Sequence, residues 1–485
     1  MKIEIYNFGP ISKFEFDTSS DFHLIVGDNN IGKSYALSIF YFIVKEFLKF
    51  EKLIKVNPYF YNIGLGDESE DETKIILNAL GKKIRDNRIY DIDITDTFLQ
   101  LAEVVFIREL MEGVDKQVES TYGEGGFVSN QFNPNVPSVF KIELDSLKFS
   151  IEYKIGDFRI FDLDFGTKII LRPAKQNRSP IEQSGNLILY RNTKDERIED
   201  CYYQIISLCN EFVRQNFRVG MGGIDEIDFL PASRSGLYQA LSAFGQIIAE
   251  LSKSRSFLTS KIELPNIASQ LSDYFIKLTS IQNSSNVDEQ YEGIARQIEV
   301  EILKGRIDYD FDKKRIFYIP NDTDLRLDIS NASSMISETA PIVAYIRHIL
   351  SRRERQISVG LRGQLKSKTG KVTKKILIIE EPEAYLHPKN QLAITEIYSK
   401  LSKLGVKIIM TSHSNYVFNK FSNLIITEKI ATENVRCDLL EMTGVGSVAR
   451  KLDVDEMGVD DQNFGDVTEI LINERMDFFN KKNDK

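Results

Sequence analysis

The sequence predicts an α/β fold whose core carries two additions, an antiparallel β lobe and a helical insertion. Three observations favour this class. Residues 23–26 form a short apolar run, followed by a glycine-rich turn and an apolar stretch typical of a helix. Two further runs, residues 376–379 and 407–410, are mainly apolar and end in polar side chains, which is typical of buried parallel strands. Residues 140–172 alternate between apolar and polar side chains, which favours an antiparallel meander.

The chain opens with a predicted β-hairpin. Residues 2–16 alternate in polarity on both sides of the turn Asn7-Phe8-Gly9-Pro10, and this hairpin leads into the strand at residues 23–26. The helix after the glycine-rich turn is expected to run to about Leu53. Residues 57–73 contain proline, glycine and a cluster of acidic side chains, and we interpret them as a solvated loop.

The middle of the chain alternates between helical and extended patterns. Helical patterning is weak across residues 74–112, and a glycine- and proline-containing turn covers residues 123–137. Residues 201–218 favour a helix. Residues 240–303 are rich in helical stretches with polar breaks and without sustained heptads, which favours a compact helical insertion over a coiled coil. Residues 306–329 return to strands.

The bulk composition limits the class of protein. The chain has 485 residues, 42% of them hydrophobic, which is enough for a substantial core. A net charge of −9 argues against a generally basic surface, although a local basic groove remains compatible with it. The three cysteines show no metal-ligand spacing, which fits a reducing cytoplasm. The sequence contains no apolar run long enough to cross a membrane, so we expect a cytoplasmic protein without a membrane partner.

The strongest motif is Gly27-Asp28-Asn29-Asn30-Ile31-Gly32-Lys33-Ser34, a complete G-x-x-x-x-G-K-S phosphate-binding loop. Glycines let backbone N–H groups curl around an anion, and the following helix N-terminus adds partial positive charge. Lys33 is expected to reach the β- and γ-phosphates, and Ser34 to place its hydroxyl on a magnesium ion. The alternative is a chance match in a glycine turn. The residues predicted to bind the nucleotide here are Gly27, Asn29, Asn30, Gly32, Lys33 and Ser34.

Acidic residues follow the apolar run at residues 376–379. Beside a phosphate loop, this run and Glu380-Glu381 resemble a Walker B strand, because ligands bind at the carboxyl ends of parallel strands. Glu380 is predicted to hold Mg²⁺ and Glu381 to accept a proton from the attacking water. His413 follows the strand at residues 407–410, and a neutral imidazole there can donate to a phosphate oxygen or orient the water. The alternatives are a solvated turn and a structural histidine.

Arg234 follows the apolar stretch Ile227-Asp228-Phe229-Leu230-Pro231 at the tip of a predicted strand. Loops at strand tips often present site residues, so Arg234 is a candidate for contact with the nucleotide. An ordinary surface arginine is the alternative.

The order of these motifs resembles that of the ATP-binding-cassette-type AAA ATPases of the SMC and RecF-like group. The most specific parts are Ile5-Tyr6-Asn7-Phe8-Gly9-Pro10-Ile11 and Glu380-Glu381-Pro382-Glu383-Ala384-Tyr385-Leu386-His387-Pro388, followed by Thr411-Ser412-His413-Ser414. Within that group the chain looks most similar to the ATPase part of overcoming-lysogenization-defect nucleases and related prokaryotic anti-phage ATPases. The resemblance is clear at the two ends of the chain and weak in the middle. It implies an ABC-type P-loop NTPase core, with ATP and Mg²⁺ as ligands.

The resemblance also implies a head-to-tail dimer or a higher homo-oligomer. Residues 383–387 match the D-loop of the family, which crosses the dimer interface, although His387 stands where aspartate is usual. Residues 331–335 precede the helix expected at 336–350 and match the signature loop. Ser333 and Ser334 would then contact the γ-phosphate held by the other subunit. Met335 occupies a position where glycine is common in the family.

The domain boundaries follow from this assignment. The predicted parts are residues 1–56 as the N-terminal part of the ATPase core, 57–224 as an insertion with the β-meander, 225–239 as a return to the core, 240–305 as the helical insertion, 306–430 as the C-terminal part of the core, and 431–485 as a C-terminal tail.

Nuclease members of the resembled group carry a TOPRIM domain after the stretch that His413 matches. Asp453, Asp455, Asp460 and Asp461 lie in a polar stretch without an apolar strand to set up a metal site, so we interpret them as solvated. We therefore expect a separate effector protein. A basic run at residues 352–375, opposed only by Glu354, is either a DNA- or partner-contacting loop or a solvated connector.

These inferences predict a slow ATPase that acts as a nucleotide-gated switch or sensor, with an anti-phage role implied by the resemblance. Two alternatives remain open. The first is a nucleotide-bound scaffold that holds and inhibits an effector with little hydrolysis. The second is a RecF-like clamp in DNA repair.

Overall fold

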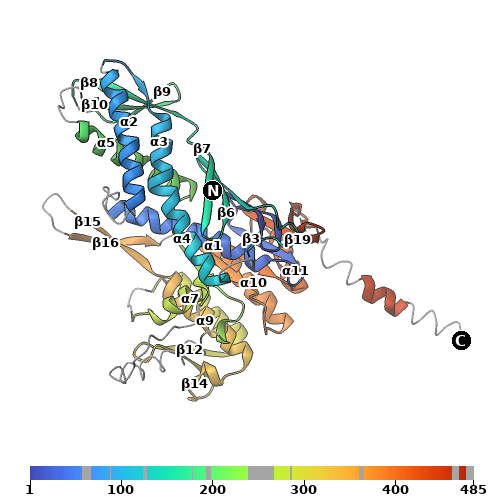
Figure 1. Ribbon diagram of the computed structural model, residues 1–485. Coiled ribbons are helices and arrows are strands. Elements are labelled where there is room, and N and C mark those ends of the chain that lie inside the picture. The colour runs from blue at the N-terminus through green and yellow to red at the C-terminus, as the bar shows by residue number, and fades with distance from the viewer. Residues whose placement is uncertain are drawn as a thin grey trace, which may run out of the picture. The chain divides into compact units, whose positions relative to one another are not determined.

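The computed structural model describes residues 1–56, 67–87, 89–123, 128–176, 178–192, 198–236, 238, 267–283, 287–359, 365–372, 374–460 and 469–476. The chain forms two compact units, coloured along the sequence in Figure 1. Unit 1 comprises Met1–Ser19, Tyr35–Asp225 and Gly444–Gly446. Unit 2 comprises Ser20–Ser34, Glu226–Thr443 and Ser447–Lys485.

Unit 1 contains an antiparallel sheet in the order β2-β1-β5-β6-β7. The hairpin predicted for residues 2–16 is confirmed, because β1 (Lys2–Phe8) pairs with β2 (Ile11–Asp17) and places Lys2 opposite Asp17. The meander is confirmed for β5 (Ser138–Leu144), β6 (Leu147–Lys154) and β7 (Asp157–Asp164). Phe16 of β2 stacks on Phe40 of α1 (Lys33–Val56) with ring centroids 4.3 Å apart, so this helix covers a buried face of the sheet.

The meander does not continue through residue 172 as predicted. Instead, β8 (Lys168–Ala174) joins a separate small sheet in the order β4-β8-β10-β9. It pairs in parallel with β10 (Asn186–Asn192) and antiparallel with β4 (Ile92–Asp93). Alternating polarity marks a strand but does not specify its partner, and this is why the sequence misplaces β8. The remaining strand of this small sheet is β9 (Ile181–Gln183).

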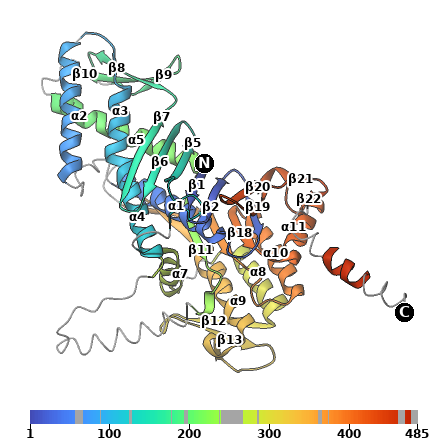
Figure 2. The same cartoon turned by 45° about the vertical axis from the view of Figure 1, so that its right-hand side comes forward.

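The helices of unit 1 are α2 (Asp67–Asp86), α3 (Thr95–Ala102) with its π-helical continuation η2 (Glu103–Ile107), α4 (Arg108–Tyr122) and α5 (Ile198–Gly220). In Figures 1 and 2, α2 and α3 run side by side with the small sheet at one end.

The prediction of a loop at residues 57–73 is wrong from Asp67 onward, where α2 begins. An acidic cluster suits a solvated loop, but carboxylates also stabilise the first turns of a helix. The part from residue 57 to 66 lies outside the described residues.

Unit 2 contains a mainly parallel sheet in the order β11-β17-β18-β3-β19-β20. The strands predicted at residues 23–26, 376–379 and 407–410 are confirmed as β3, β17 and β18. Since β17, β18, β3 and β19 are parallel neighbours, their carboxyl ends lie along one edge. The strands are β3 (Phe22–Gly27), β11 (Ile224–Leu230), β17 (Lys374–Glu380), β18 (Val406–Ser412), β19 (Val435–Thr443) and β20 (Gly446–Lys451).

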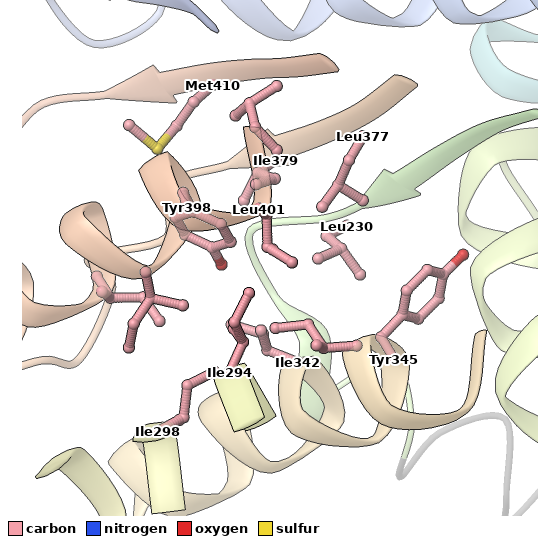
Figure 3. Close-up of a cluster of buried hydrophobic side chains, with 14 of the residues drawn as sticks. Leu230, Ile294, Ile298, Ile342, Tyr345, Leu377, Ile379, Tyr398, Leu401 and Met410 are labelled. Carbon is pink, nitrogen blue, oxygen red and sulfur yellow. The ribbon is translucent and has the colours of Figure 1, made fainter. Parts of the chain in front are cut away.

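Helices from distant parts of the sequence cover this sheet. In Figure 3, Ile294 of α8 and Ile342 of α9 face Leu230 and Leu377 on the strands, and Leu401 of α10 lies beside them. These side chains are almost fully buried and form part of one continuous apolar core. The helical elements are α7 (Ser269–Thr279), α8 (Glu289–Ile298), η4 (Glu299–Leu303), η5 (Ile329–Asn331), α9 (Ser334–Tyr345), η6 (Ile346–Leu350), α10 (Pro388–Lys403), α11 (Asn415–Ile426) and η7 (Thr432–Asn434).

Further strands complete unit 2. The predicted return to strands is confirmed by β12 (Gly305–Asp310), β13 (Arg315–Pro320) and β14 (Leu327–Asp328). The basic run at residues 352–375 contains a two-stranded hairpin, β15 (Arg353–Val359) with β16 (Leu365–Val372). A small hairpin, β21 (Val454–Asp455) with β22 (Gly458–Val459), follows β20. Residues 240–266 of the predicted helical insertion lie outside the described residues. Among the described helices, none is both long and apolar enough to span a bilayer.

Candidate functional site

The loop between β3 and α1 is built on backbone that an L side chain would disturb. Gly27 and Gly32 have φ values of +141° and +100°, and Asn30 lies in the left-handed region at +61°. A Cβ added at Gly27 would lie 2.4 Å from the main-chain oxygen of Leu440 on β19. Glycine is therefore required where the loop leaves the sheet, because both the backbone angle and the neighbouring strand exclude a side chain.

Lys33, the first residue of α1, folds back into the loop. Its Nζ donates to the main-chain oxygens of Gly27 and Asp28 at 2.9 and 2.6 Å, and the residue is only 6% exposed. Burial lowers the pKa of Lys33 to about 8, and the negative charges of Glu381, Asp28 and Glu383 oppose that effect. The ammonium group is therefore held inside the curve of the loop.

Glu380 ends β17 beside the last residue of the loop. Its carboxylate accepts hydrogen bonds from the Ser34 hydroxyl and from the main-chain N–H of Ala232. Burial raises the pKa of Glu380, and the charge of Glu381 raises it further, while the Ser34 bond acts in the opposite direction. Two hard oxygen donors from opposite ends of the sequence thus meet at the carboxyl edge of the sheet.

Glu381 and His413 lie together on neighbouring strands. The Glu381 Oε1 and the His413 Nε2 are 3.4 Å apart. The hydrogen bond from His413 is the main reason that the pKa of Glu381 is lowered, so this carboxylate is ionised at neutral pH. The backbone of Glu381 is left-handed, with φ of +42°, and its N–H donates to the Thr411 main-chain oxygen at 3.2 Å.

Glu383 belongs to the same cluster, although no role inside one subunit was predicted for it. It is 8% exposed, and its Oε1 accepts from the Ser412 hydroxyl at 2.7 Å and from the His413 main-chain N–H at 2.8 Å. Its Oε2 is buried without a hydrogen-bond partner among the described residues. Burial raises the pKa of Glu383. The sequence Glu380-Glu381-Pro382-Glu383 was the one signal that Glu383 lies near the site. Its contact with Ser412 could not be predicted, because that contact depends on which strands pair.

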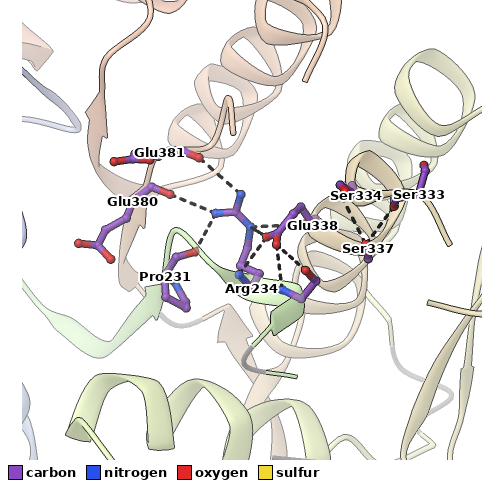
Figure 4. Close-up of polar contacts among 9 residues, drawn as sticks. Pro231, Arg234, Ser333, Ser334, Ser337, Glu338, Glu380 and Glu381 are labelled. Carbon is purple, nitrogen blue, oxygen red and sulfur yellow. Dashed lines mark hydrogen bonds and ion pairs between the residues drawn. The ribbon is translucent and has the colours of Figure 1, made fainter. Parts of the chain in front are cut away.

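Arg234 is buried beneath Glu380 and Glu381, with 1% of its surface exposed. Its Nη1 donates to the main-chain oxygens of Pro231 and Glu380 at 2.9 and 3.1 Å, and its Nη2 to that of Glu381 at 3.5 Å. Figure 4 shows the guanidinium between these carbonyls and Glu338 of α9. The surface-arginine alternative is thereby excluded. Nucleotide contact by Arg234 stays a prediction.

Ser333 and Ser334 are exposed at the beginning of α9. Ser333 is the N-cap residue, but its side chain makes no capping bond, while the Ser337 hydroxyl donates to the Ser333 carbonyl at 2.9 Å. The Met335 side chain is partly buried against the core, and its sulfur lies 3.6 Å from the Asn390 amide nitrogen. These contacts hold the methionine side chain against its own subunit.

His387 has a local structural role. It is the N-cap of α10, where its Nδ1 accepts from the Lys389 main-chain N–H at 3.3 Å. An aspartate, which the resembled family usually has here, serves as an N-cap in the same way. The exchange of aspartate for histidine therefore preserves the start of this helix.

The residues present fit a magnesium nucleotide. Mg²⁺ prefers oxygen ligands and is usually held by few protein groups together with substrate phosphates. The Ser34 hydroxyl and the Glu380 carboxylate supply such oxygens, and the buried Lys33 ammonium and the start of α1 supply positive charge for phosphates. When bound, the ion would neutralise phosphate charge.

The acidic stretch near the end of the chain is exposed where the structure describes it. Asp453, Asp455 and Asp460 are exposed around the β21–β22 hairpin, and Asp461 lies outside the described residues. Among the described residues, no group of three or more histidine, cysteine, aspartate or glutamate side chains is arranged to hold a metal ion.

The chain belongs to the AAA ATPase domain family, whose model matches residues 1–231 and 164–418. No curated protein sequence matches significantly. Similar solved structures include the SMC head domain from Thermotoga maritima, with 9% identity, coverage of 93% of this chain and 98% of that one, and a TM-score of 0.35. The Smc head with an extended coiled coil, bound to the C-terminal domain of ScpA, from Pyrococcus furiosus has 10% identity, coverage of 98% of both chains and a TM-score of 0.31. The family assignment rests on the sequence match.

Proposed function

We propose that this protein binds and slowly hydrolyses ATP. Lys33 and the loop at residues 27–34 would hold the phosphates, with Ser34 and Glu380 on the magnesium ion. Glu381 would accept the proton of the attacking water, and His413 would orient that water or donate to the γ-phosphate. The supporting observation is the meeting of the Glu381 carboxylate and the His413 imidazole, 3.4 Å apart, at the sheet edge where Ser34 meets Glu380.

The chemistry of the two acidic residues supports this division of roles. Glu381 has a lowered pKa and stays ionised, so it is able to accept a proton. The raised pKa of Glu380 reflects a carboxylate that has lost solvent, and a nearby cation would favour its ionised form. These properties support a role for Glu380 in holding the ion and for Glu381 in acting on water.

We further propose that two chains associate head-to-tail around two ATP molecules. Ser333 and Ser334 are exposed at a helix N-terminus, as contact with a partner's γ-phosphate requires. Tyr385, within the stretch that matches the D-loop, is 68% exposed. Hydrolysis would reopen this interface and give the conformational output of a switch. Anti-phage defence with a separate nuclease or toxin as effector is the context that the sequence motifs support.

Replacing Glu381 with glutamine tests this function. Glu381→Gln keeps the size of the side chain but removes the proton acceptor, so kcat should fall by about 10²- to 10⁴-fold while ATP binding persists. The variant should accumulate as an ATP-bound dimer or larger oligomer, measured by light scattering after size exclusion. The exposed Glu433→Gln is the matched control, and Lys33→Ala should lose ATP binding.

Two results would contradict parts of this proposal. Hydrolysis by Glu381→Gln at the wild-type rate would remove Glu381 as the base. Tight ATP binding by the wild-type protein without turnover, alone or with the products of neighbouring genes, would favour the scaffold function over the ATPase.

A further inference from the structure

Arg234 and Glu338 form a buried pair between the beginning of α9 and the end of β17. Glu338 is 3% exposed and lies in the second turn of α9. Its carboxylate accepts from the main-chain N–H of Arg234 at 2.9 Å and from the N–H and hydroxyl of Ser235 at 3.2 and 2.5 Å. The Arg234 Nε donates to the Glu338 main-chain oxygen at 3.1 Å and lies 3.6 Å from the carboxylate.

The other end of the Arg234 side chain supports the turn that carries the proposed base. Its guanidinium donates to the carbonyls of Glu380 and Glu381. Glu381 needs this support, because its left-handed backbone is unfavourable for a residue with a side chain. A shift of these carbonyls would change the direction in which the Glu381 carboxylate points.

The pair also reaches the serines at the start of α9. Ser334 and Glu338 are one helical turn apart on the same helix, and Ser337 ties the first turn together through its bond to the Ser333 carbonyl. A displacement of α9 must therefore either carry Arg234 with it or break a buried, hydrogen-bonded ion pair. Figure 4 shows both groups of bonds, those of Ser337 at the start of α9 and those that join Arg234 to Glu338 and to the carbonyls of Glu380 and Glu381.

We propose that Arg234 and Glu338 are positioning residues that couple the serines at the start of α9 to Glu381 of the same chain. This inference rests on the proposed dimer, in which those serines contact the partner's nucleotide. Engagement of one nucleotide would then set the position of the base that acts on the other, so the two sites would hydrolyse ATP cooperatively. In this proposal Arg234 acts through the carbonyls of Glu380 and Glu381, and this role replaces its predicted contact with the nucleotide.

The test compares Glu338→Gln with Glu299→Gln. Glu299 is a matched control, because it too is buried and accepts from an arginine, Arg347, and from a main-chain N–H, that of Ile307. We expect Glu338→Gln to lower kcat at least tenfold, to leave the KM for ATP within about threefold, and to reduce the Hill coefficient toward 1. Glu299→Gln should change none of these beyond twofold. Equal effects of the two substitutions would overturn the proposal.

A milder variant guards against misfolding. Ser235→Ala removes only the hydroxyl bond to Glu338 and should show the same pattern with a smaller loss of kcat. Thr395→Ala, which removes a buried hydroxyl bonded within α10, is its control. If Arg234→Lys raises the KM more than tenfold at an unchanged kcat, Arg234 contacts the nucleotide and the positioning role is wrong.

A second measurement needs no nucleotide and so separates this inference from the proposed function. Amide hydrogen exchange of a peptide covering residues 376–386 should be faster in Glu338→Gln than in Glu299→Gln, because the turn at Glu381 loses its support. Equal protection in the two variants would overturn the coupling even if the wild-type protein hydrolyses ATP. If exchange is faster in Glu338→Gln than in Glu299→Gln and the wild-type protein shows no ATPase activity, the coupling is supported and the proposed reaction is rejected.

Discussion

At the residue scale, the side-chain amine of Lys33 loses its proton within an accessible pH range. The buried ammonium has a pKa of about 8, and only its protonated form attracts phosphate. Above pH 8 the protein must take up a proton to bind ATP, so affinity should fall as pH rises, by up to about tenfold per pH unit. Calorimetric titration at pH 7 to 9.5, in buffers of different ionisation enthalpy, measures both the affinity and the proton uptake. An affinity independent of pH, without proton uptake, would contradict this role of Lys33.

Glu383 offers a second test at the same scale. Its raised pKa means that the folded protein binds a proton more tightly than the unfolded chain does. Its contribution to stability is therefore fully present below about pH 4.5, the value in the unfolded chain, and decreases as pH rises through the raised value. Glu383→Gln should retain the acceptor for Ser412 and His413 and weaken this pH dependence. Glu383→Ala should lose about 1–3 kcal/mol by leaving those donors unpaired.

Thermal unfolding of the wild type and both Glu383 variants between pH 4.5 and 8 checks this expectation. Glu380 also has a raised pKa and contributes in the same direction, so the difference between the wild type and Glu383→Gln is the informative quantity. A constant difference across this pH range would show that Glu383 does not titrate there.

At the element scale, the fit of the loop between β3 and β19 predicts a steric requirement at Gly27. Gly27→Ala should reduce ATP affinity more than tenfold and lower the thermal midpoint, because its Cβ would overlap the Leu440 carbonyl. Gly405→Ala is the matched control. Gly405 also has a positive φ, of +87°, but open space surrounds its Cβ, so alanine there costs only about 1 kcal/mol of backbone strain. Equal losses in the two variants would mean that backbone strain alone matters at Gly27.

The local sequence was sufficient to predict the strands, the loop and the helix that carry the site motifs. The strand, loop and helix around Lys33 and the strands ending at Glu380 and Ser412 were predictable, because an apolar run followed by a glycine loop or an acidic pair has few alternatives. The meeting of Glu381 and His413 also followed, since parallel neighbours share a carboxyl edge.

Long-range contacts were not predictable in the same way. The partner of Arg234 lies 104 residues away on α9, and no local pattern identifies it. The strand β19 escaped prediction because Arg436 and Asp438 interrupt its apolar pattern. These two side chains are buried only because they pair with each other and with His23 on β3, where the His23–Asp438 distance is 2.7 Å.

At the scale of the whole molecule, the charge distribution bears on the two interpretations of the basic run at residues 352–375. A net charge of −9 repels nucleic acid on average, so DNA binding requires a concentrated basic segment. Within the described residues, this segment contributes the two paired strands β15 and β16. In a solvated connector, the same charges would have no ligand.

Neutralising Lys366, Lys368 and Lys371 together tests the DNA interpretation. If these residues contact phosphates, DNA affinity should fall at low salt, and the slope of log K against log[salt] should become shallower by about one for each contact removed, because fewer counterions are released on binding. Fluorescence anisotropy with a labelled duplex across a salt series measures both quantities. A variant with Lys52, Lys82 and Lys154 neutralised, all three exposed on unit 1, controls for the change in net charge. Equal affinities and slopes in the hairpin variant and the wild type would assign residues 352–375 to a solvated connector, and equal losses in both variants would reduce the effect to overall charge.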